Sequence, residues 1–233
     1  MPRIAAIYGA GNWIKGFNMN NIEILRESGL VEIECKDFSD QNLLSLASEF
    51  GSIVPGARGE LVQPLPAREK GTGPIGSFSY SVGYGSFPWH TDTAYWGTPA
   101  RFLLLASDTK SPCATTYQSF DFLQTRVEDF DYLMKRAVYL LNVPGIKRYL
   151  SPIFEIEGEK GYRLDYHIYR PINEEATVLM KRVGQVLEQN YLRHLWTGRN
   201  VVVIDNWKVI HARECADIDK NRFLKRIYIN ELV

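Results

Sequence analysis

Two short apolar runs, far apart in the chain, constrain the fold more than any other feature of this sequence. They are Arg101-Phe-Leu-Leu-Leu-Ala106 and Asn200-Val-Val-Val-Ile-Asp205, and the second is rich in β-branched side chains. A run of this length that is apolar at every central position predicts a strand with both faces covered. We therefore expect a β-rich core in which these two strands are buried.

Two other segments have the spacing of helices. Ser39 can cap a helix whose apolar residues recur every three or four positions as far as Phe50, with Gly51 to end it. A longer helix is expected after Pro171, and its apolar side is formed by Ala176, Leu179, Met180, Val183, Val186 and Leu187. We place His194 at the end of this helix, where a histidine interacts favourably with the helix dipole.

The remaining chain is expected to supply strands and loops. Polar and aromatic residues alternate from Ser77 to Tyr84, which predicts a strand, while Gly56 to Gly73 is rich in glycine, proline and charge and predicts a surface loop that could cover a site. The resulting order is helix, strands, helix, strands. That order suits a β-rich α+β fold, namely a double-stranded β-helix (jelly-roll, cupin-like) barrel flanked by helices, in one domain spanning 1–233.

A possible metal site is marked by His90-Thr91-Asp92. Residues i and i+2 of a strand project from the same face, so this imidazole and this carboxylate can reach one ion. His211, soon after the second apolar run, is the preferred third ligand; His167, on a plausible strand, is the alternative. Two histidines and one carboxylate leave several coordination positions open, which is the ligand set of non-haem Fe(II) oxygenases.

Arginine follows the proposed distal histidine at two positions. Arg222 and Arg226 are four residues apart and are expected on one face of the last strand. A planar guanidinium makes paired, charge-assisted hydrogen bonds to a carboxylate. The pair could therefore hold the far acid group of a dicarboxylate cosubstrate.

From about Phe38 to Tyr228 the chain resembles the TauD/clavaminate synthase-like branch of Fe(II)/2-oxoglutarate dioxygenases. The resemblance is carried by His90-Thr-Asp92, Pro112-Cys-Ala-Thr115, Ile204-Asp-Asn-Trp-Lys-Val-Ile-His211-Ala-Arg213, Arg222 and Arg226. It implies that His90, Asp92 and His211 are catalytic ligands of the iron and that Arg222 pairs with the C5 carboxylate of 2-oxoglutarate. It further implies a hydroxyl from Thr115 on that carboxylate, with Thr116 as the adjacent candidate, and places Arg226 near a substrate or cosubstrate acid group. Pro112-Cys113 stands where the family usually has a glycine pair.

The same resemblance implies a reaction. Fe(II), 2-oxoglutarate and O2 would hydroxylate an unactivated C–H bond of a small, amino-acid-like metabolite and release succinate and CO2. Two other functional hypotheses are compatible with the same three ligands. One is a cupin-like metal-dependent hydrolase or isomerase, and the other is a noncatalytic metabolite-binding barrel. Arg163 and Asp165 could contact a zwitterionic substrate or could form an ordinary surface ion pair.

Composition excludes several other classes of protein. Lys plus Arg and Asp plus Glu both total 27, so the chain has no basic field for nucleic acid. It has 3 cysteines without paired spacing, which favours a reducing, cytoplasmic setting. No apolar run suits a signal peptide or a membrane span. Gly9-Ala-Gly11 lacks the third glycine of a dinucleotide fingerprint, and nothing in the sequence indicates an oligomeric state.

Overall fold

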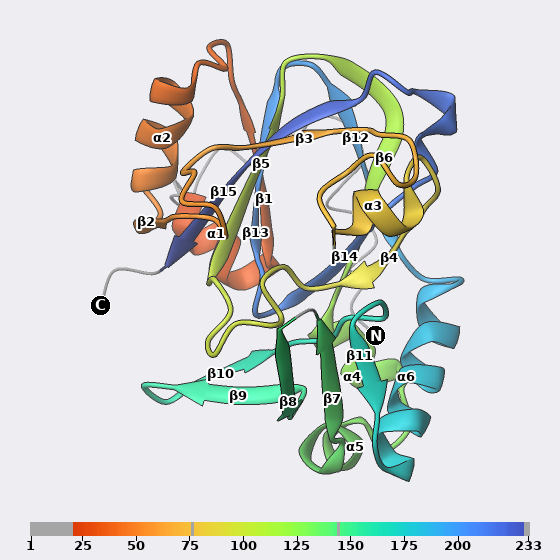
Figure 1. The fold of residues 1–233 in the computed structure, drawn as a ribbon. Helices are drawn as coiled ribbons and strands as arrows, with labels where there is room; N and C mark the ends of the chain where they lie inside the picture. Colours follow the sequence, from red (N-terminus) through yellow and green to blue (C-terminus); the bar gives the residue numbers. More distant parts are fainter. Residues whose placement is uncertain (1–20, 76, 144, 231–233) are drawn as a thin grey trace.

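The computed structural model describes residues 21–75, 77–143 and 145–230, and its main feature is a pair of antiparallel sheets (Figure 1). In the six-stranded sheet the order is β1-β13-β5-β15-β2, with β3 also paired to β15. Its strands are β1 (Leu30–Glu34), β2 (Ser52–Val54), β3 (Gln63–Pro66), β5 (Phe102–Ser107), β13 (Asn200–Asp205) and β15 (Phe223–Asn230). The four-stranded sheet has the order β12-β6-β14-β4. Its strands are β4 (Phe87–His90), β6 (Lys110–Ser119), β12 (Leu192–Thr197) and β14 (Val209–Arg213).

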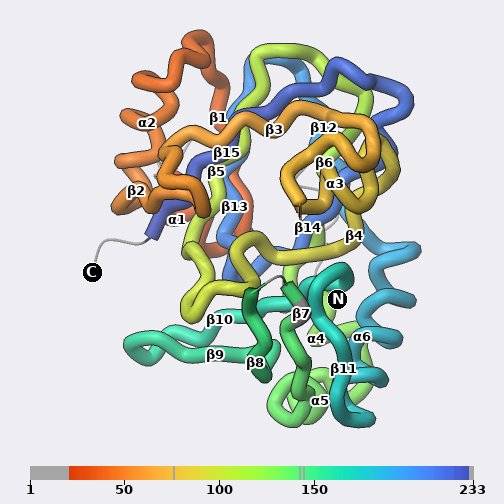
Figure 2. Tube along the Cα trace, in the orientation of Figure 1, coloured from red at the N-terminus to blue at the C-terminus, as the bar shows by residue number. Residues whose placement is uncertain are grey.

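The chain between β6 and β12 forms a second layer of structure, which lies below the two sheets in Figures 1 and 2. A three-stranded sheet and a hairpin pack there with three helices around their own apolar cluster. These elements are α4 (Phe120–Arg126), α5 (Phe130–Arg136), β7 (Tyr139–Val143), β8 (Ile146–Leu150), β9 (Ile153–Ile156), β10 (Glu159–Tyr162), β11 (Tyr169–Pro171) and α6 (Glu174–Leu187). Four elements lie outside both groups: α1 (Asn21–Ser28), α2 (Asp40–Ser48), α3 (Phe78–Val82) and the 3-10 turn η1 (Ala216–Ile218).

The two apolar runs form the centre of the larger sheet, as predicted. Every residue of β5 and β13 is buried, and the two strands are hydrogen-bonded neighbours, with Val202 opposite Leu105. Alternate side chains point to opposite faces of a strand. One face, with Leu104 and Val203, packs against α1 and α2, while the other, with Leu105 and Val202, packs toward the smaller sheet. Both faces are therefore covered.

Two predicted helices are confirmed. The Ser39 side chain accepts a hydrogen bond from the Asn42 backbone at 3.3 Å and caps α2, which ends at Ser48, shortly before Gly51. Asn173 caps α6 in the same way. The buried residues of α6 are Ala176, Leu179, Val183 and Leu187, all of them on the predicted apolar side.

Three local predictions are wrong. Residues 77–84 contain the helix α3, because Ser77 caps it by accepting from Tyr80 N and Gly83, with a φ of 64°, ends it. His194 lies in β12, since α6 has already ended at Leu187. The segment from Gly56 to Gly73 includes β3, whose pairing with β15 outweighs its proline content because β3 is an edge strand.

The predicted fold class is confirmed as far as a β-rich structure with flanking helices. The N-terminal motif Gly9-Ala-Gly11 lies outside the described residues. Among the helices of the described ranges, none has both the length and the apolar character needed to cross a membrane.

Candidate metal centre

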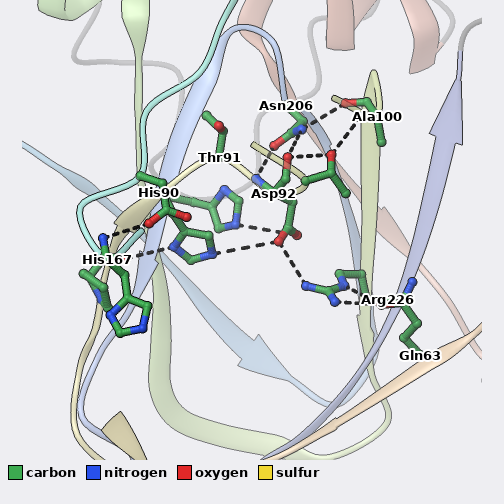
Figure 3. Close-up of polar contacts among 12 residues, drawn as sticks. Gln63, His90, Thr91, Asp92, Ala100, His167, Asn206 and Arg226 are labelled. Atoms are coloured by element: carbon green, nitrogen blue, oxygen red, sulfur yellow. Dashed lines mark hydrogen bonds and ion pairs between the residues drawn. The ribbon is translucent and has the colours of Figure 1, made fainter. Parts of the chain in front are cut away.

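The pairing of β4 with β14 brings together residues that are far apart in the sequence. His211 of β14 lies directly opposite His90 at the end of β4, and their ring centroids are 4.4 Å apart. Opposed residues of an antiparallel pair project from the same face. Asp92 follows His90 by two positions and lies beside both rings (Figure 3).

These three side chains surround a small buried space. His90 Nε2 is 3.9 Å from Asp92 Oδ1, and His211 Nε2 is 3.9 Å from Asp92 Oδ2. All three residues are buried, and one ligand atom from each lies within 4.8 Å of the others. Because 3.9 Å is too long for a hydrogen bond, the nitrogens face the carboxylate without bonding to it. Such a set suits a shared cation.

The protonation states also suit a metal. Burial lowers the pKa of His211 to about 3 and lowers the pKa of His90, so both rings are neutral near pH 7. Burial alone would raise the pKa of Asp92, but Arg226 and the two imidazoles outweigh it and the pKa is lowered. His90 Nδ1 lies 2.8 Å from the carbonyl of Pro88, to which it can donate. That contact leaves Nε2 as the lone-pair atom facing Asp92.

Asn206 fixes the backbone of Asp92, a role that the sequence analysis did not predict. Its Oδ1 accepts from Asp92 N at 2.8 Å, and its Nδ2 donates to the carbonyls of Asp92 and Ala100, each at 2.9 Å (Figure 3). Thr93 adds bonds to the same two residues, donating to Asp92 O and accepting from Ala100 N. The buried side-chain amide of Asn206 therefore fixes the backbone that carries the Asp92 carboxylate. The only signal in the sequence was a polar turn after a buried strand.

Arg226 contacts the carboxylate directly. Its Nη1 lies 3.0 Å from Asp92 Oδ1, and its Nε and Nη2 donate to Gln63 Oε1 at 3.2 and 2.7 Å (Figure 3). Gln63 belongs to β3, within the segment that we expected to be a loop. The position of Arg226 near an acid group of the substrate or cosubstrate stays a prediction, and the carboxylate that Arg226 contacts in the structure is Asp92.

A cavity of about 90 Å³ adjoins the three side chains and is lined by residues of both sheets. Thr115 and Arg222 line it together, and Arg222 Nη2 donates to Thr115 Oγ1 at 3.2 Å. Arg222 Nε also donates to the carbonyl of Cys113. Thr116 is the next residue of β6 and so points to the opposite face. Of the two adjacent threonines, Thr115 faces the cavity.

Neither of the other histidines of the described chain belongs to this cluster. His167 is exposed, and its ring lies 5.1 Å from that of Phe78. His194 is buried beside Glu32, with 3.3 Å between Nδ1 and the carboxylate. His211 is therefore the histidine that the structure brings to His90.

Of the two alternatives for Arg163 and Asp165, the surface ion pair is wrong, because both residues are buried, and contact with a zwitterionic substrate stays a prediction. Arg163 donates to backbone carbonyls, among them Trp96 and Gly97. Asp165 accepts from the backbone nitrogens of His167 and Ile168, and burial raises its pKa to about 7.

The lowered pKa values predict a specific pH dependence of stability for the metal-free protein. A histidine whose pKa is lower in the folded state does not change the free energy of unfolding above about pH 6.5, its ordinary pKa. Below that pH it lowers the free energy of unfolding, because the unfolded chain takes up the proton more readily than the folded one. His211, whose pKa in the folded state is about 3, removes about 1.4 kcal/mol per pH unit below about pH 6.5, and the lowered pKa of His90 acts in the same direction. Asp165 opposes them by one proton between pH 7 and 4, because its pKa is raised. A net loss of stability is expected from pH 6.5 to 5, measured by urea unfolding.

Replacing His211 by Asn should abolish most of that loss. The variant removes the contribution of His211, and the raised pKa of Asp165 then opposes the remaining contribution of His90. An equally steep decline in the variant would contradict the assignment of the proton to His211.

Solved structures of several iron oxygenases share this fold. Asparagine oxygenase, solved with Fe(II), 3-hydroxyasparagine and succinate, has a TM-score of 0.71 at 14% identity over 89% of this chain and 76% of its own. PvcB from Pseudomonas aeruginosa has a TM-score of 0.67 at 19% identity, covering 88% and 77%. OrfP with Fe and alpha-ketoglutaric acid has a TM-score of 0.67 at 20% identity, covering 89% and 79%. No protein-family model matches the sequence, and no curated protein is significantly similar to it. The resemblance inferred from the sequence is confirmed at the level of the fold.

Proposed function

We propose that this chain is an Fe(II)- and 2-oxoglutarate-dependent oxygenase that hydroxylates an unactivated C–H bond of a small, amino-acid-like metabolite. The observation that carries the proposal is one cavity with two kinds of lining. His90, Asp92 and His211 stand at one part of it, and the guanidinium of Arg222 with the hydroxyl of Thr115 at another. A metal chelate and a remote acid group are what a keto diacid needs.

The residues fit a ferrous ion by the chemistry of their donor atoms. Two neutral imidazoles and one carboxylate form the facial set of non-haem iron oxygenases and leave positions open for other ligands. When bound, Fe(II) would supply the activation of O2 that drives decarboxylation of 2-oxoglutarate to succinate and CO2. In this proposal His90, Asp92 and His211 are the protein ligands.

The chain's own groups orient the reactants. Arg222 and Thr115 would hold the C5 carboxylate of 2-oxoglutarate, which turns its keto acid toward the histidines. Arg226 would keep Asp92 ionised and directed at the metal through the 3.0 Å contact, and it would lie near an acid group of the cosubstrate or substrate. Asn206 would hold Asp92 in place, as outer contacts of a metal site do. The apolar walls, including Leu105 and Leu224, would exclude water.

The amino-acid-like substrate is inferred from two solved relatives of the fold. Asparagine oxygenase was solved with 3-hydroxyasparagine, and OrfP with hydroxy-L-Arg. We further infer a double-stranded β-helix in a single domain, spanning 1–233. The free cysteines Cys35, Cys113 and Cys215 suit a reducing, cytoplasmic setting, and the neutral net charge argues against a nucleic-acid partner.

Anaerobic titration with Fe(II) and 2-oxoglutarate tests the proposal before any substrate is known. A weak charge-transfer band is expected on adding 2-oxoglutarate to the iron-loaded protein. Candidate amino acids are then screened in air for stimulated release of succinate, with one succinate expected for each substrate oxidised. A metal-dependent hydrolase or isomerase would give neither the band nor succinate. That outcome would reject the oxygenase.

A further inference from the structure

The part of the cavity that contains Arg222 also contains a second arginine. Arg213 is the last residue of β14, two positions after His211, and it lies opposite Thr115 of β6. Residues opposed in this way share a face of the sheet. Arg213 lines the same cavity as Thr115 and Arg222, and it is 7% exposed.

Among the residues that the structure describes, Arg213 forms no ion pair. Nη2 donates to the carbonyls of Gly83 and Gly85, and the guanidinium lies 3.5 Å over the ring of Phe87. Nε is buried and has no hydrogen-bond partner within the described ranges. Carbonyl dipoles and an aromatic face stabilise a cation, but none of them neutralises it.

Arg222 likewise forms no ion pair among the described residues. Its bonded partners are the Thr115 hydroxyl and the Cys113 carbonyl. Of the carboxylates nearby, Glu214 pairs with Arg193 at 2.6 Å, and Asp219 accepts from Ser111. The charge of Asp219 favours the Arg222 cation, but the two residues form no ion pair, and burial still lowers the pKa of Arg222. Two buried guanidiniums thus line one cavity, and no carboxylate of the described residues is bonded to either of them. Burial of cations is unfavourable unless an anion compensates them, so this end of the cavity favours an anionic group.

We propose that Arg213 is a second guanidinium for the remote carboxylate of 2-oxoglutarate, which it holds together with Arg222 and Thr115. This inference rests on the proposed function and adds a residue to its cosubstrate site. The alternative role for Arg213 is purely structural: it would hold the backbone of Gly83 and Gly85 near α3, whose Phe78 and Ser79 also line the cavity.

A comparison of two keto acids separates the two roles. 2-Oxopentanoate has the keto acid group and chain length of 2-oxoglutarate but ends in a methyl group. Binding of both to the iron-loaded protein is measured without O2 from the chelate band. Arg213→Gln is expected to weaken the binding of 2-oxoglutarate by at least about tenfold, which is about 1.4 kcal/mol, and to leave the binding of 2-oxopentanoate unchanged. Equal effects on the two acids, or no effect on either, would overturn the proposal.

Further variants keep the test decisive. Arg213→Lys retains a charge and should lose less affinity for 2-oxoglutarate than Arg213→Gln, so it serves if the glutamine variant fails to fold. Arg193→Gln is the control: it removes an arginine of β12 that pairs with Glu214 outside the cavity, and it should leave the affinity for both keto acids unchanged. In the metal-free protein, 2-oxoglutarate should raise the Tm less in either Arg213 variant than in wild type.

The wild-type protein distinguishes the failure of this inference from that of the proposed function. If wild type binds neither keto acid, the oxygenase proposal fails and Arg213 has no cosubstrate to hold. If wild type binds the two acids equally well, the remote carboxylate is not recognised. The inference about Arg213 and the proposed role of Arg222 and Thr115 are then both wrong, while chelation of a 2-oxo acid by the iron site is retained. If wild type prefers 2-oxoglutarate and Arg213→Gln keeps that preference, only the inference about Arg213 fails.

Discussion

Asp92→Ala is expected to abolish iron-dependent turnover of 2-oxoglutarate. The carboxylate is the single anionic member of the buried cluster, and both imidazole Nε2 atoms face it at 3.9 Å. Loss of an outer contact of a metal site costs about 10- to 100-fold in affinity or activity, and loss of a ligand should cost more. We expect Fe(II) affinity to fall by over about a hundredfold, measured by calorimetry without O2.

The fold should survive this substitution. Asn206 binds the backbone of residue 92 and not its side chain, so these hydrogen bonds remain in the alanine variant. Arg226 loses its carboxylate partner but keeps Gln63. Circular dichroism and thermal unfolding of the metal-free variant serve as the control. Turnover at the wild-type rate in a folded Asp92→Ala protein would exclude Asp92 as a ligand.

Arg222→Ala should raise the requirement for 2-oxoglutarate sharply while leaving metal binding intact. Hydrogen bonds to a charged group contribute about 1.5–3 kcal/mol, which corresponds to roughly a ten- to hundredfold change in affinity. Arg222 lies on the cavity wall with Thr115 and makes no contact with the proposed ligands. The measurements are the KM for 2-oxoglutarate and the Kd for Fe(II) in its absence.

Arg226→Ala is the matched comparison, because it removes a guanidinium from the same strand, β15. Arg226 bonds to Asp92, so its loss is expected to weaken metal binding as well as turnover. If Arg226→Ala raises only the 2-oxoglutarate requirement and Arg222→Ala does not, the two arginines have been assigned in reverse.

The sequence predicted the parts of this site that depend on spacing within one element. β5 and β13 were recognisable because a strand buried on both faces is apolar at every central position. His90 and Asp92 were expected on one strand, whose geometry places residues i and i+2 on one face. The structure brings the two side chains together, but β4 ends at His90 and Asp92 lies in the turn that follows. His211 was recognisable because it follows a buried strand and precedes two arginines in the chain.

The parts that depend on pairing between distant segments could not be predicted in this way. Asn206 binds the backbone of Asp92, and Gln63 bonds to Arg226. Arg213 lines the cavity because of the register between β14 and β6. No periodicity in the sequence marks such contacts. Local signals also competed. The alternation from Ser77 to Tyr84 favoured a strand, but the serine cap and the glycine that ends α3 decided in favour of a helix. His194 was misplaced because the length of α6 was overestimated.

The clamp by Asn206 has a consequence for how the chain acquires its metal. Asn206 joins segments separated by 114 positions and lies in the turn between β13 and β14. Contacts of such long sequence separation form slowly, because the intervening loop must close first. A nascent chain that ends before Asn206 lacks both this clamp and, further along, the distal imidazole of β14. For the proposed iron site, metal binding would therefore follow the pairing of β4 with β14 and would not guide the early steps of folding.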